Sequence, residues 1–212
     1  MRCRLEDQMV QVQQANQLTL REVEGKFGLR YVRNPAFFPE WRTTTADLSE
    51  YERKILDQAQ SSFVYLNKDV MQEALVKMIV VSPMLLVAGF YEEPYMTFAE
   101  QSTEVTVIDD ERDELIRGKV DVLVAQESVW IVVIEAKGSK IDISTGVPQV
   151  LTYMLSSANQ NRSLYGVVTN GVHTMFVKVS ANRREYGFSK PYSLYTPGND
   201  LYDVVSVLRA IS

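Results

Sequence analysis

The sequence predicts an α/β protein in which helices flank a mixed β-sheet core, preceded by a helical N-terminal extension. Three observations predict this class. Apolar residues recur at helical spacing through most of residues 48–89. Runs rich in β-branched residues follow between residues 95 and 134, and two more come after residue 163. A helical segment separates these two groups of strands, and this order is typical of a mixed sheet covered by helices.

The composition is that of a globular protein with one main hydrophobic core. Of the 212 residues, 46% are hydrophobic and 23% are charged, which lies close to the averages for globular domains. A chain of this length buries enough apolar surface to fold around a single core. We therefore expect residues 1–66 to form the N-terminal extension and residues 67–212 to form the main domain.

What the sequence lacks excludes several kinds of site. Its single cysteine, Cys3, cannot form an internal disulfide. The chain also has only one histidine, so its cysteine and histidine together cannot supply the four ligands of a structural zinc site. The N-terminus lacks the apolar core of a signal peptide. Lys77 and Pro83 interrupt the most apolar stretch, residues 75–90, so that stretch should be a buried helix pair and not a membrane span. We expect a cytoplasmic protein.

The N-terminal part is predicted to be mainly helical. Thr19 and Glu22 have capping-box spacing, and Gly28 follows a short helical pattern, so one helix should end just before that glycine. An aromatic loop at residues 35–41 should anchor the chain through its two phenylalanines and its tryptophan. The helices expected in this part cover residues 20–27, 48–65 and 69–81, with a short third segment from Pro83 to Gly89.

The rest of the chain is predicted to supply the sheet. The continuous apolar run of residues 129–134 suits a central strand buried on both faces. Asn170 and Gly171 form a hairpin-turn signal, and the acidic run of residues 109–114 is typical of a hydrated turn. The strands expected here cover residues 95–107, 115–125, 129–134, 164–169 and 172–179, and the helices cover residues 148–157 and 201–210.

One acidic residue interrupts an otherwise apolar predicted strand. By the period-two rule, Asp121 and Leu123 point to one face, and the valines at positions 120, 122 and 124 point to the other. A buried carboxylate without a partner costs several kcal/mol. Asp121 therefore needs a neighbouring charge, a metal ion or water.

The end of the next predicted strand supplies further charges. Glu135 and Lys137 stand at i and i+2 and share a face, while Ala136 points away. Asp121, Glu135 and the backbone carbonyl of Ala136 would suit Mg²⁺, with positions left for water and a phosphate. Lys137 would then orient the attacking water or neutralise developing charge, which are the parts that phosphodiester hydrolysis requires. The alternative from the same residues is a structural salt bridge at the strand end.

Two polar residues on the following helix extend this face. Gln149 and Tyr153 stand at i and i+4, so they lie on one side of the helix that comes directly after the predicted site. That side would reach a nucleic-acid backbone. The alternative is an N-terminal polar residue and a half-buried tyrosine with no role in chemistry.

Together these residues resemble a known nuclease pattern. Asp121 after Gly-x-x, an apolar strand ending in Glu135-Ala-Lys137, and Gln149-x-x-x-Tyr153 are similar to the motifs of the PD-(D/E)xK nuclease superfamily. Residues 69–179, about half of the chain, resemble the nuclease domain of type I restriction enzyme motor subunits. Residues 18–23 and 37–41 are similar to segments of small cyanobacterial restriction-endonuclease-like proteins.

The resemblance implies roles for individual residues. It implies a restriction-endonuclease-like fold, in which Asp121 and Glu135 bind Mg²⁺ or Mn²⁺ and Lys137 assists the water. It implies that Gln149 and Tyr153 support the site or contact DNA. A further acid in such nucleases comes from a helix before the first core strand, and Glu73 stands in the matching place. The other candidates for that acid are Glu100 and Glu104.

The sequence departs from the motor subunits in one large respect. It has no G-x-x-x-x-G-K-[ST] phosphate loop, so any ATP-driven motor must lie outside this chain. The expected function is metal-dependent hydrolysis of DNA in restriction or defence, and two sites in a homodimer would be the simplest way to cut both strands. The alternative is a catalytically inactive module of the same fold that binds nucleic acid or a protein. The net charge of −5 leaves that alternative open, because strong nonspecific DNA binding requires excess Lys and Arg.

Overall fold

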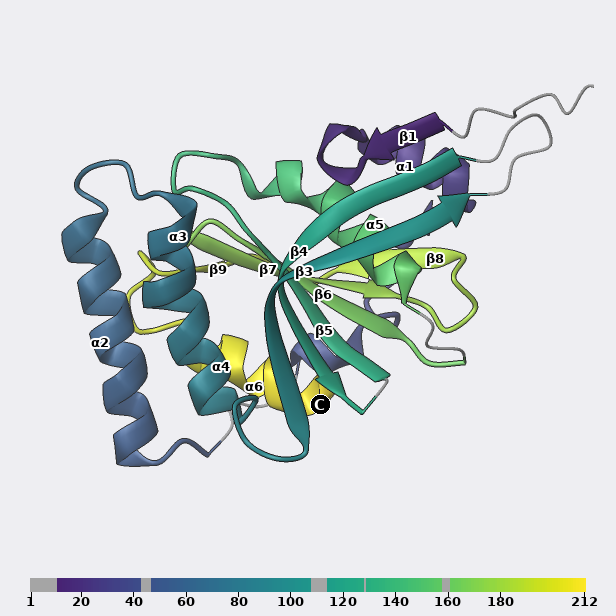
Figure 1. Ribbon diagram of the computed structural model, residues 1–212. Coiled ribbons are helices and arrows are strands. Elements are labelled where there is room, and N and C mark those ends of the chain that lie inside the picture. The colour runs from purple at the N-terminus through teal and green to yellow at the C-terminus, as the bar shows by residue number, and fades with distance from the viewer. Residues whose placement is uncertain (1–10, 43–46, 108–113, 128, 158–160) are drawn as a thin grey trace, which may run out of the picture.

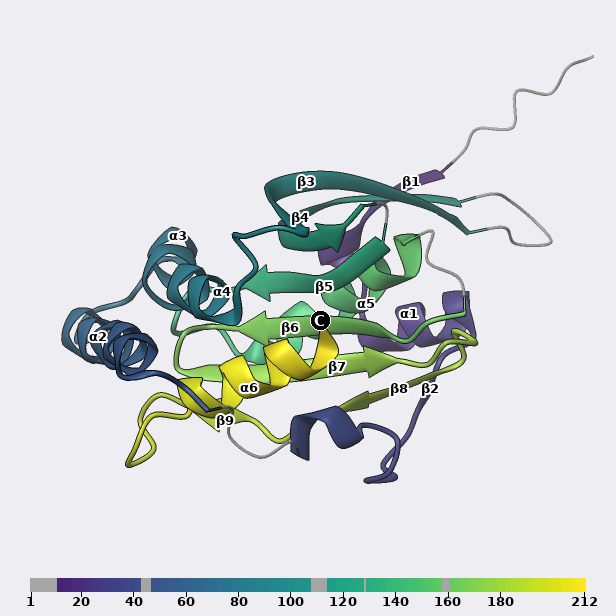
Figure 2. The ribbon, with the colours of Figure 1, turned by 90° about the horizontal axis from the view of Figure 1, so that it is seen from below.

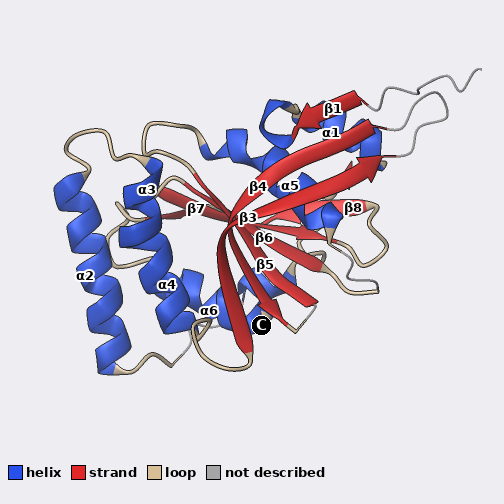
Figure 3. Cartoon of the chain, viewed as in Figure 1, coloured by secondary structure: helices blue, strands red, loops and turns tan. Residues whose placement is uncertain are grey.

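A large β-sheet forms the centre of the molecule (Figure 1, Figure 3). The computed structural model describes residues 11–42, 47–107, 114–127, 129–157 and 161–212. Within these residues, nine strands form one sheet. The strands are β1 (Gln11–Gln14), β2 (Arg30–Tyr31), β3 (Tyr95–Val107), β4 (Glu114–Gln126), β5 (Val129–Ala136), β6 (Leu164–Thr169), β7 (His173–Val179), β8 (Glu185–Phe188) and β9 (Tyr192–Ser193).

Helices connect and cover these strands. Short 3-10 turns lie at Ala15–Gln17, Pro39–Arg42 and Ile143–Gly146. The longer segments are α1 (Leu20–Phe27), α2 (Glu50–Leu66), α3 (Glu73–Val76), the π-helical η3 (Lys77–Val81), α4 (Ser82–Ala88), α5 (Val147–Ser156) and α6 (Leu201–Ile211).

The sheet is mixed, as the sequence predicts. Its order is β1-β4-β5-β6-β7-β8-β2, with β3 paired to β4 and β9 paired to β7. Strands β3, β4 and β5 follow one another as antiparallel neighbours, and β6 pairs with β5 in parallel after the α5 crossover. A parallel pair needs such a crossover, because a tight turn can join only antiparallel strands. The predicted α/β class is confirmed, and the arrangement is consistent with the expected restriction-endonuclease-like core.

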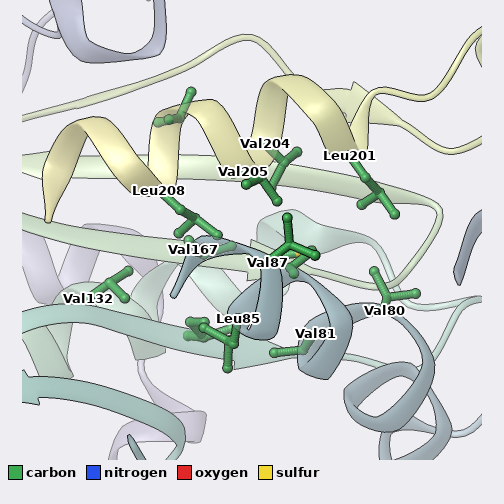
Figure 4. Packing of buried hydrophobic residues seen from close by; sticks show 14 of the residues in the cluster. Val80, Val81, Leu85, Val87, Val132, Val167, Leu201, Val204, Val205 and Leu208 are labelled. Carbon is green, nitrogen blue, oxygen red and sulfur yellow. The ribbon is translucent and has the colours of Figure 1, made fainter. Parts of the chain in front are cut away.

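Helices lie on both faces of the sheet (Figure 2), and each face has its own hydrophobic layer. Helices α2, α4 and α6 pack on one face and form a cluster that we call the α6 core. Helices α1 and α5 pack on the other face and form the α5 core. Figure 4 shows the α6 core at close range, where aliphatic residues of α6, η3 and α4 meet strand residues. Those drawn with labels are Val80, Val81, Leu85, Val87, Val132, Val167, Leu201, Val204, Val205 and Leu208.

The helix ends follow the local sequence signals. Thr19 and Ser49 each begin a helix with a complete capping box, made with Glu22 and Glu52 respectively. Such caps satisfy backbone N–H groups that have no partner within the helix. Gly28 ends α1 in the left-handed conformation, at a φ of 64°. The prediction of a helix over residues 20–27 is therefore confirmed.

The helix expected over residues 69–81 starts later and does not stop at Pro83. It begins at Glu73 and runs on without a break through η3 into α4, so the two expected helices are one. In η3, the amide of Ser82 donates to the carbonyl of Lys77, five residues back. Proline cannot donate to the preceding turn, and the wider π-helical turn directly before Pro83 accommodates that loss.

Several short strands escape the sequence prediction. Strands β1, β2, β8 and β9 have only two to four residues each. So few residues show no clear alternation, and pairing with distant strands decides their conformation. The remaining predicted elements lie close to their observed bounds, while residues 109–113 of the predicted acidic turn lie outside the described residues.

The aromatic segment anchors the N-terminal part as expected. Phe38 is buried in the α6 core, and Phe37 and Trp41 pack against it. No helix in the described part of the chain is long and apolar enough to cross a membrane. The boundary between residues 66 and 67 stays a prediction.

Strand β4 does not keep one alternation along its length. Val122 and Val124 belong to the α6 core, but Val120 lies with Leu123 in the α5 core, so the prediction that all three valines share a face is wrong. The neighbouring strand is irregular at the same point: in β3, Glu100 lies between the pairs Ala99–Val122 and Gln101–Val120 and has a φ of 55°. A left-handed residue locally disturbs the geometry of a strand, and Figure 1 shows that β3 and β4 are both curved strands.

Candidate functional site

The candidate site lies at an interruption in the pairing of β4. One edge of β4 pairs with β3 along its whole length, and the other edge is shared by two partners. Strand β1 takes positions 114–117 and β5 takes positions 122–126. Between them the hydroxyl of Tyr153 on α5 accepts a hydrogen bond from the amide of Lys119, at 3.3 Å. On this edge of β4, residues 118–121 therefore have no paired strand among the described residues, and the Tyr153 side chain bonds the one amide at Lys119.

Asp121 lies at the end of this interruption and is held on both of its oxygens. Its Oδ2 accepts a hydrogen bond from the backbone amide of Ala136, at 2.7 Å. Its Oδ1 accepts one from the Nζ of Lys77, at 3.0 Å. Because the β4–β5 register ends with Val122 opposite Ile134, the next residues along, Asp121 and Glu135, come together at the same end of the hairpin.

Glu135 and Lys137 form a buried pair beside Asp121. The Nζ of Lys137 donates to Glu135 Oε1 at 2.5 Å and to Gln149 Oε1 at 2.7 Å. Gln149 in turn donates from Nε2 to the Tyr153 hydroxyl at 3.1 Å. Hydrogen bonds therefore run without interruption from Glu135 to α5, and they fix where the Lys137 ammonium lies.

The electrostatics of Glu135 are unusual for a carboxyl group. Only 2% of the residue is exposed, and its Oε2 has no hydrogen-bond partner among the described residues. Burial, reinforced by the negative charge of Asp121, raises the pKa of Glu135 to about 7, although Lys137 acts in the opposite direction. A carboxyl group with this pKa changes its charge close to neutral pH.

The three candidates for the helix-borne acid have different positions. Glu73 on α3 and Glu100 on β3 both bond to Lys77 Nζ, at 3.3 and 2.6 Å. Glu104 instead pairs with Arg117, at 2.8 Å. Glu73 and Glu100 thus both reach the neighbourhood of Asp121, and Glu104 pairs elsewhere on the hairpin.

Lys77 is the member of this cluster that the sequence does not single out. In the sequence it only interrupts an apolar stretch, yet its Nζ bonds three carboxylates, those of Glu73, Glu100 and Asp121. Burial alone would lower the pKa of Lys77, but the bonds to Glu100 and Asp121 outweigh it and raise that pKa above its usual value. The spacing of Glu73 and Lys77 at i and i+4 was the one signal available in the sequence.

Asp121 and Glu135 fit a divalent metal ion as a pair of carboxylates. Each carboxylate has about four lone-pair positions, and Glu135 Oε2 is buried without a partner among the described residues. Hard cations such as Mg²⁺ take oxygen ligands of this kind. Within the described residues no three Asp, Glu, His or Cys side chains form a group that could hold a metal ion, so the remaining ligands would have to be backbone or water. The carbonyl of Ala136 stays a predicted ligand.

A pocket of about 550 Å³ opens beside the site. Gln149 and Tyr153 line it, and so do Arg117 and Lys119 of β4. Because Gln149 is only 8% exposed and Tyr153 only 2%, supporting Lys137 suits them better than direct contact with a large ligand. Arg117 and Lys119 are exposed at the rim, where they can meet an anion.

Comparisons with known proteins add little to this geometry. No protein-family model and no curated protein matches the chain. Among solved structures, a fragment assigned to the HsdR subunit of a type I restriction enzyme from Vibrio vulnificus YJ016 matches with a TM-score of 0.42 and 16% sequence identity. The match covers 64% of this chain and 25% of that chain, so the present chain corresponds to only about a quarter of that protein fragment. At this level the likeness carries no conclusion about activity.

Proposed function

We propose that this chain is a metal-dependent nuclease that hydrolyses DNA phosphodiester bonds. The observation that carries the proposal is the buried pair of Asp121 and Glu135, with an unpartnered Glu135 oxygen among the described residues and a lysine ammonium fixed beside it. A structural salt bridge would leave no such oxygen, because burying one without a partner costs about 1–3 kcal/mol. The expected Mg²⁺ or Mn²⁺ would bind to these two carboxylates and supply Lewis acidity toward the phosphate and the attacking water.

The chain's own residues would perform the other tasks. Lys137, held by Glu135 and Gln149, presents an ammonium group that orients water or neutralises charge developing on the phosphate. Tyr153 and Gln149 keep that ammonium in place. Burial raises the pKa of the Tyr153 hydroxyl, so this group stays neutral and acts as a hydrogen-bond partner, not as a base.

The neighbouring pocket offers a path for the substrate backbone. Arg117 and Lys119 lie on its rim at alternate positions of β4, so both can face one strand of phosphates. Their charges are partly offset by Glu104 and Glu100. Binding at this rim would therefore be weak and sensitive to salt.

The test is a cleavage assay with single-stranded and duplex DNA in Mg²⁺ or Mn²⁺. We expect cleavage by the unchanged chain and a loss of more than about 100-fold in Glu135→Ala and Lys137→Ala, the scale for removal of one transition-state contact. Lys140→Ala is the matched control, because Lys140 is exposed and lies only three residues beyond Lys137. Circular dichroism must show that the inactive variants remain folded.

A second readout is independent of activity. Mn²⁺ binding followed by calorimetry should be lost in Glu135→Ala and retained in Lys137→Ala, since only the former removes a ligand. Absence of both cleavage and Mn²⁺ binding in the unchanged chain would refute the nuclease proposal.

A binding module without catalysis is the second candidate. The ion pairs of Lys77 favour it, because they already neutralise Glu73 and Asp121, two of the acids expected at the site. Retention of labelled DNA without cleavage, and without any Mn²⁺ requirement, would support this candidate. Sedimentation of the same samples would show whether the chain forms the homodimer that duplex cutting favours.

A further inference from the structure

The pocket of about 550 Å³ beside the candidate site is lined mainly by polar side chains. Its volume lies within the range of about 300–1,000 Å³ that is typical of sites for small ligands. Two amides line it, Gln14 at the end of β1 and Asn16 in the 3-10 turn that follows. Two cations of β4 line it as well, Arg117 and Lys119. Neutral groups that both donate and accept hydrogen bonds therefore share one pocket with positive charges.

Two hydrogen bonds connect this pocket to the proposed reaction centre. Gln149 and Tyr153 belong to the lining of the pocket. Gln149 accepts a hydrogen bond from Nζ of Lys137 at 2.7 Å and donates one to the Tyr153 hydroxyl at 3.1 Å. A molecule in the pocket would therefore lie against the side chains that hold the Lys137 ammonium in place.

The pocket lies where the strand pairing of β4 is interrupted. The pairing of β4 with β1 ends at Arg117, and its pairing with β5 begins at Val122. Figure 1 shows β1 lying beside β4 at this part of the sheet. Gly118, which has no side chain, lines the pocket between the two partner strands. The amides and cations thus border a hollow and do not sit on a projecting element.

A hollow of this kind suits an unpaired base better than a base pair. Proteins that read an intact duplex place a projecting helix or strand ribbon in its major groove. A base within a duplex can enter a pocket only by leaving the stack, which costs unstacking and unpairing free energy. The edge of an unpaired base exposes donors and acceptors, and the amides of Gln14 and Asn16 offer both kinds of group in return.

The two cations suit the phosphate of the same nucleotide. The side chains of Arg117 and Lys119 are 51% and 57% exposed, so they keep their hydration until a ligand arrives. Arg117 pairs with Glu104 at 2.8 Å, and Lys119 pairs with Glu100 at 3.0 Å. A guanidinium has five N–H donors and an ammonium has three, so one carboxylate does not use all of them. Donors therefore remain for a phosphate.

We propose that the pocket binds one unpaired nucleotide of the substrate, with its base at Gln14 and Asn16 and its phosphate at Arg117 and Lys119. The chain would then cut single strands, or positions where a duplex exposes an unpaired nucleotide, in preference to intact duplex. This preference in cleavage rests on the proposed function, whereas binding of the nucleotide does not depend on it.

The first measurement is binding in chelator, followed by the fluorescence anisotropy of a labelled single-stranded oligonucleotide and of the blunt duplex of the same sequence. We expect the single strand to bind more than about 10-fold more tightly, because only the duplex must be unpaired. Gln14→Ala and Asn16→Ala should each weaken binding of the single strand by about 10-fold, the scale of one lost base contact. Gln17→Ala is the matched control, because Gln17 is an exposed amide outside the pocket lining.

The second measurement is cleavage of the same two substrates in Mg²⁺ or Mn²⁺. The single strand should be cut faster than the duplex, and Asn16→Ala should slow its cleavage at low substrate concentration, whereas Gln17→Ala should not. Tight single-strand binding that needs Gln14 and Asn16, without cleavage, supports the pocket and contradicts the proposed function. Cleavage of both substrates at equal rates overturns the inferred preference and leaves the proposed function standing. Single-strand binding that neither Gln14→Ala nor Asn16→Ala weakens overturns the assignment of the pocket.

Discussion

At the scale of single residues, Glu135 combines near-complete burial with a charge that depends on pH near neutrality. Its neighbours act in opposite directions, since Asp121 repels its negative charge and Lys137 attracts it. Burial and Asp121 together win, and the pKa rises to about 7. In the metal-free protein, ionisation of Glu135 should therefore lower the free energy of unfolding.

This gives a prediction for stability against pH. A folded-state pKa above the unfolded value means that the native state binds more protons, so stability falls as pH rises from about 4.5 to about 7 and then levels off. Glu135→Gln carries no titrating group and should lack this fall. Between pH 4.5 and pH values above 7, the free energy of unfolding of this variant should therefore rise relative to that of the unchanged chain by on the order of 3 kcal/mol. Urea unfolding in chelator at a series of pH values measures it.

The control for this test is Glu92→Gln, which changes an exposed glutamate and should leave the pH dependence of stability as it is in the unchanged chain. Parallel stability curves for Glu135→Gln and the unchanged chain would show that Glu135 is not the group responsible.

At the scale of elements, the packing of α5 against β4 decides the shape of the site. A side chain at Gly118 would lie 2.3 Å from Cε1 of Tyr153 and 3.0 Å from the Cβ of Ala15. Only glycine therefore allows the Tyr153 ring to cross β4 and bond the Lys119 amide. The interruption in strand pairing and the helix that fills it depend on each other.

Gly118→Ala should thus weaken both the fold and the support of Lys137. We expect a loss of about 1–3 kcal/mol, typical of overpacking a filled interior. Gly25→Ala is the matched control: it lies in α1 with no atom within 4 Å of the added Cβ, and it should stabilise by about 0.5–1 kcal/mol. Urea midpoints measure both, and equal midpoints for the two variants would contradict this account.

At the scale of the whole molecule, the sheet lies between two separate cores. Phe63 of α2 is fully buried in the α6 core and lies against Gly171, in the turn before β7, where an added Cβ would be 2.4 Å from its ring. Residues far apart in sequence thus belong to one packed layer. The two tryptophans report on different layers, because Trp41 packs against the α6 core and Trp130 against the α5 core.

Phe63→Ala should destabilise both layers equally. We expect a cost of about 3–5 kcal/mol, the range for truncating a buried phenylalanine. Val64→Ala, at a position that is 40% exposed, should change stability by less than about 0.5 kcal/mol. The fluorescence of Trp130 in a Trp41→Phe background follows the α5 core, and that of Trp41 in a Trp130→Phe background follows the α6 core. A shift of the unfolding midpoint in the Trp41 signal alone would mean that the two cores unfold independently.

The sequence by itself determined the elements with strong local signals and the pattern of the proposed site. Capping boxes, helical spacing and apolar runs act over a few residues, so α1, β5 and β6 follow from them. Period two likewise put Glu135 and Lys137 on one side of β5. It failed at Val120, which lies in the α5 core although Val122 and Val124 lie in the α6 core, because β4 does not keep one alternation along its length.

Only the tertiary structure decided which charges meet. Lys77 bonds Glu100 and Asp121 across 23 and 44 residues of sequence, and no local pattern encodes a contact of that range. The choice among Glu73, Glu100 and Glu104 was open in the sequence, and strand register and helix packing bring the first two together on one ammonium. The physical reason is that the packing of apolar surfaces sets which side chains lie close together, and a partly buried charge then pairs with the opposite charges within reach.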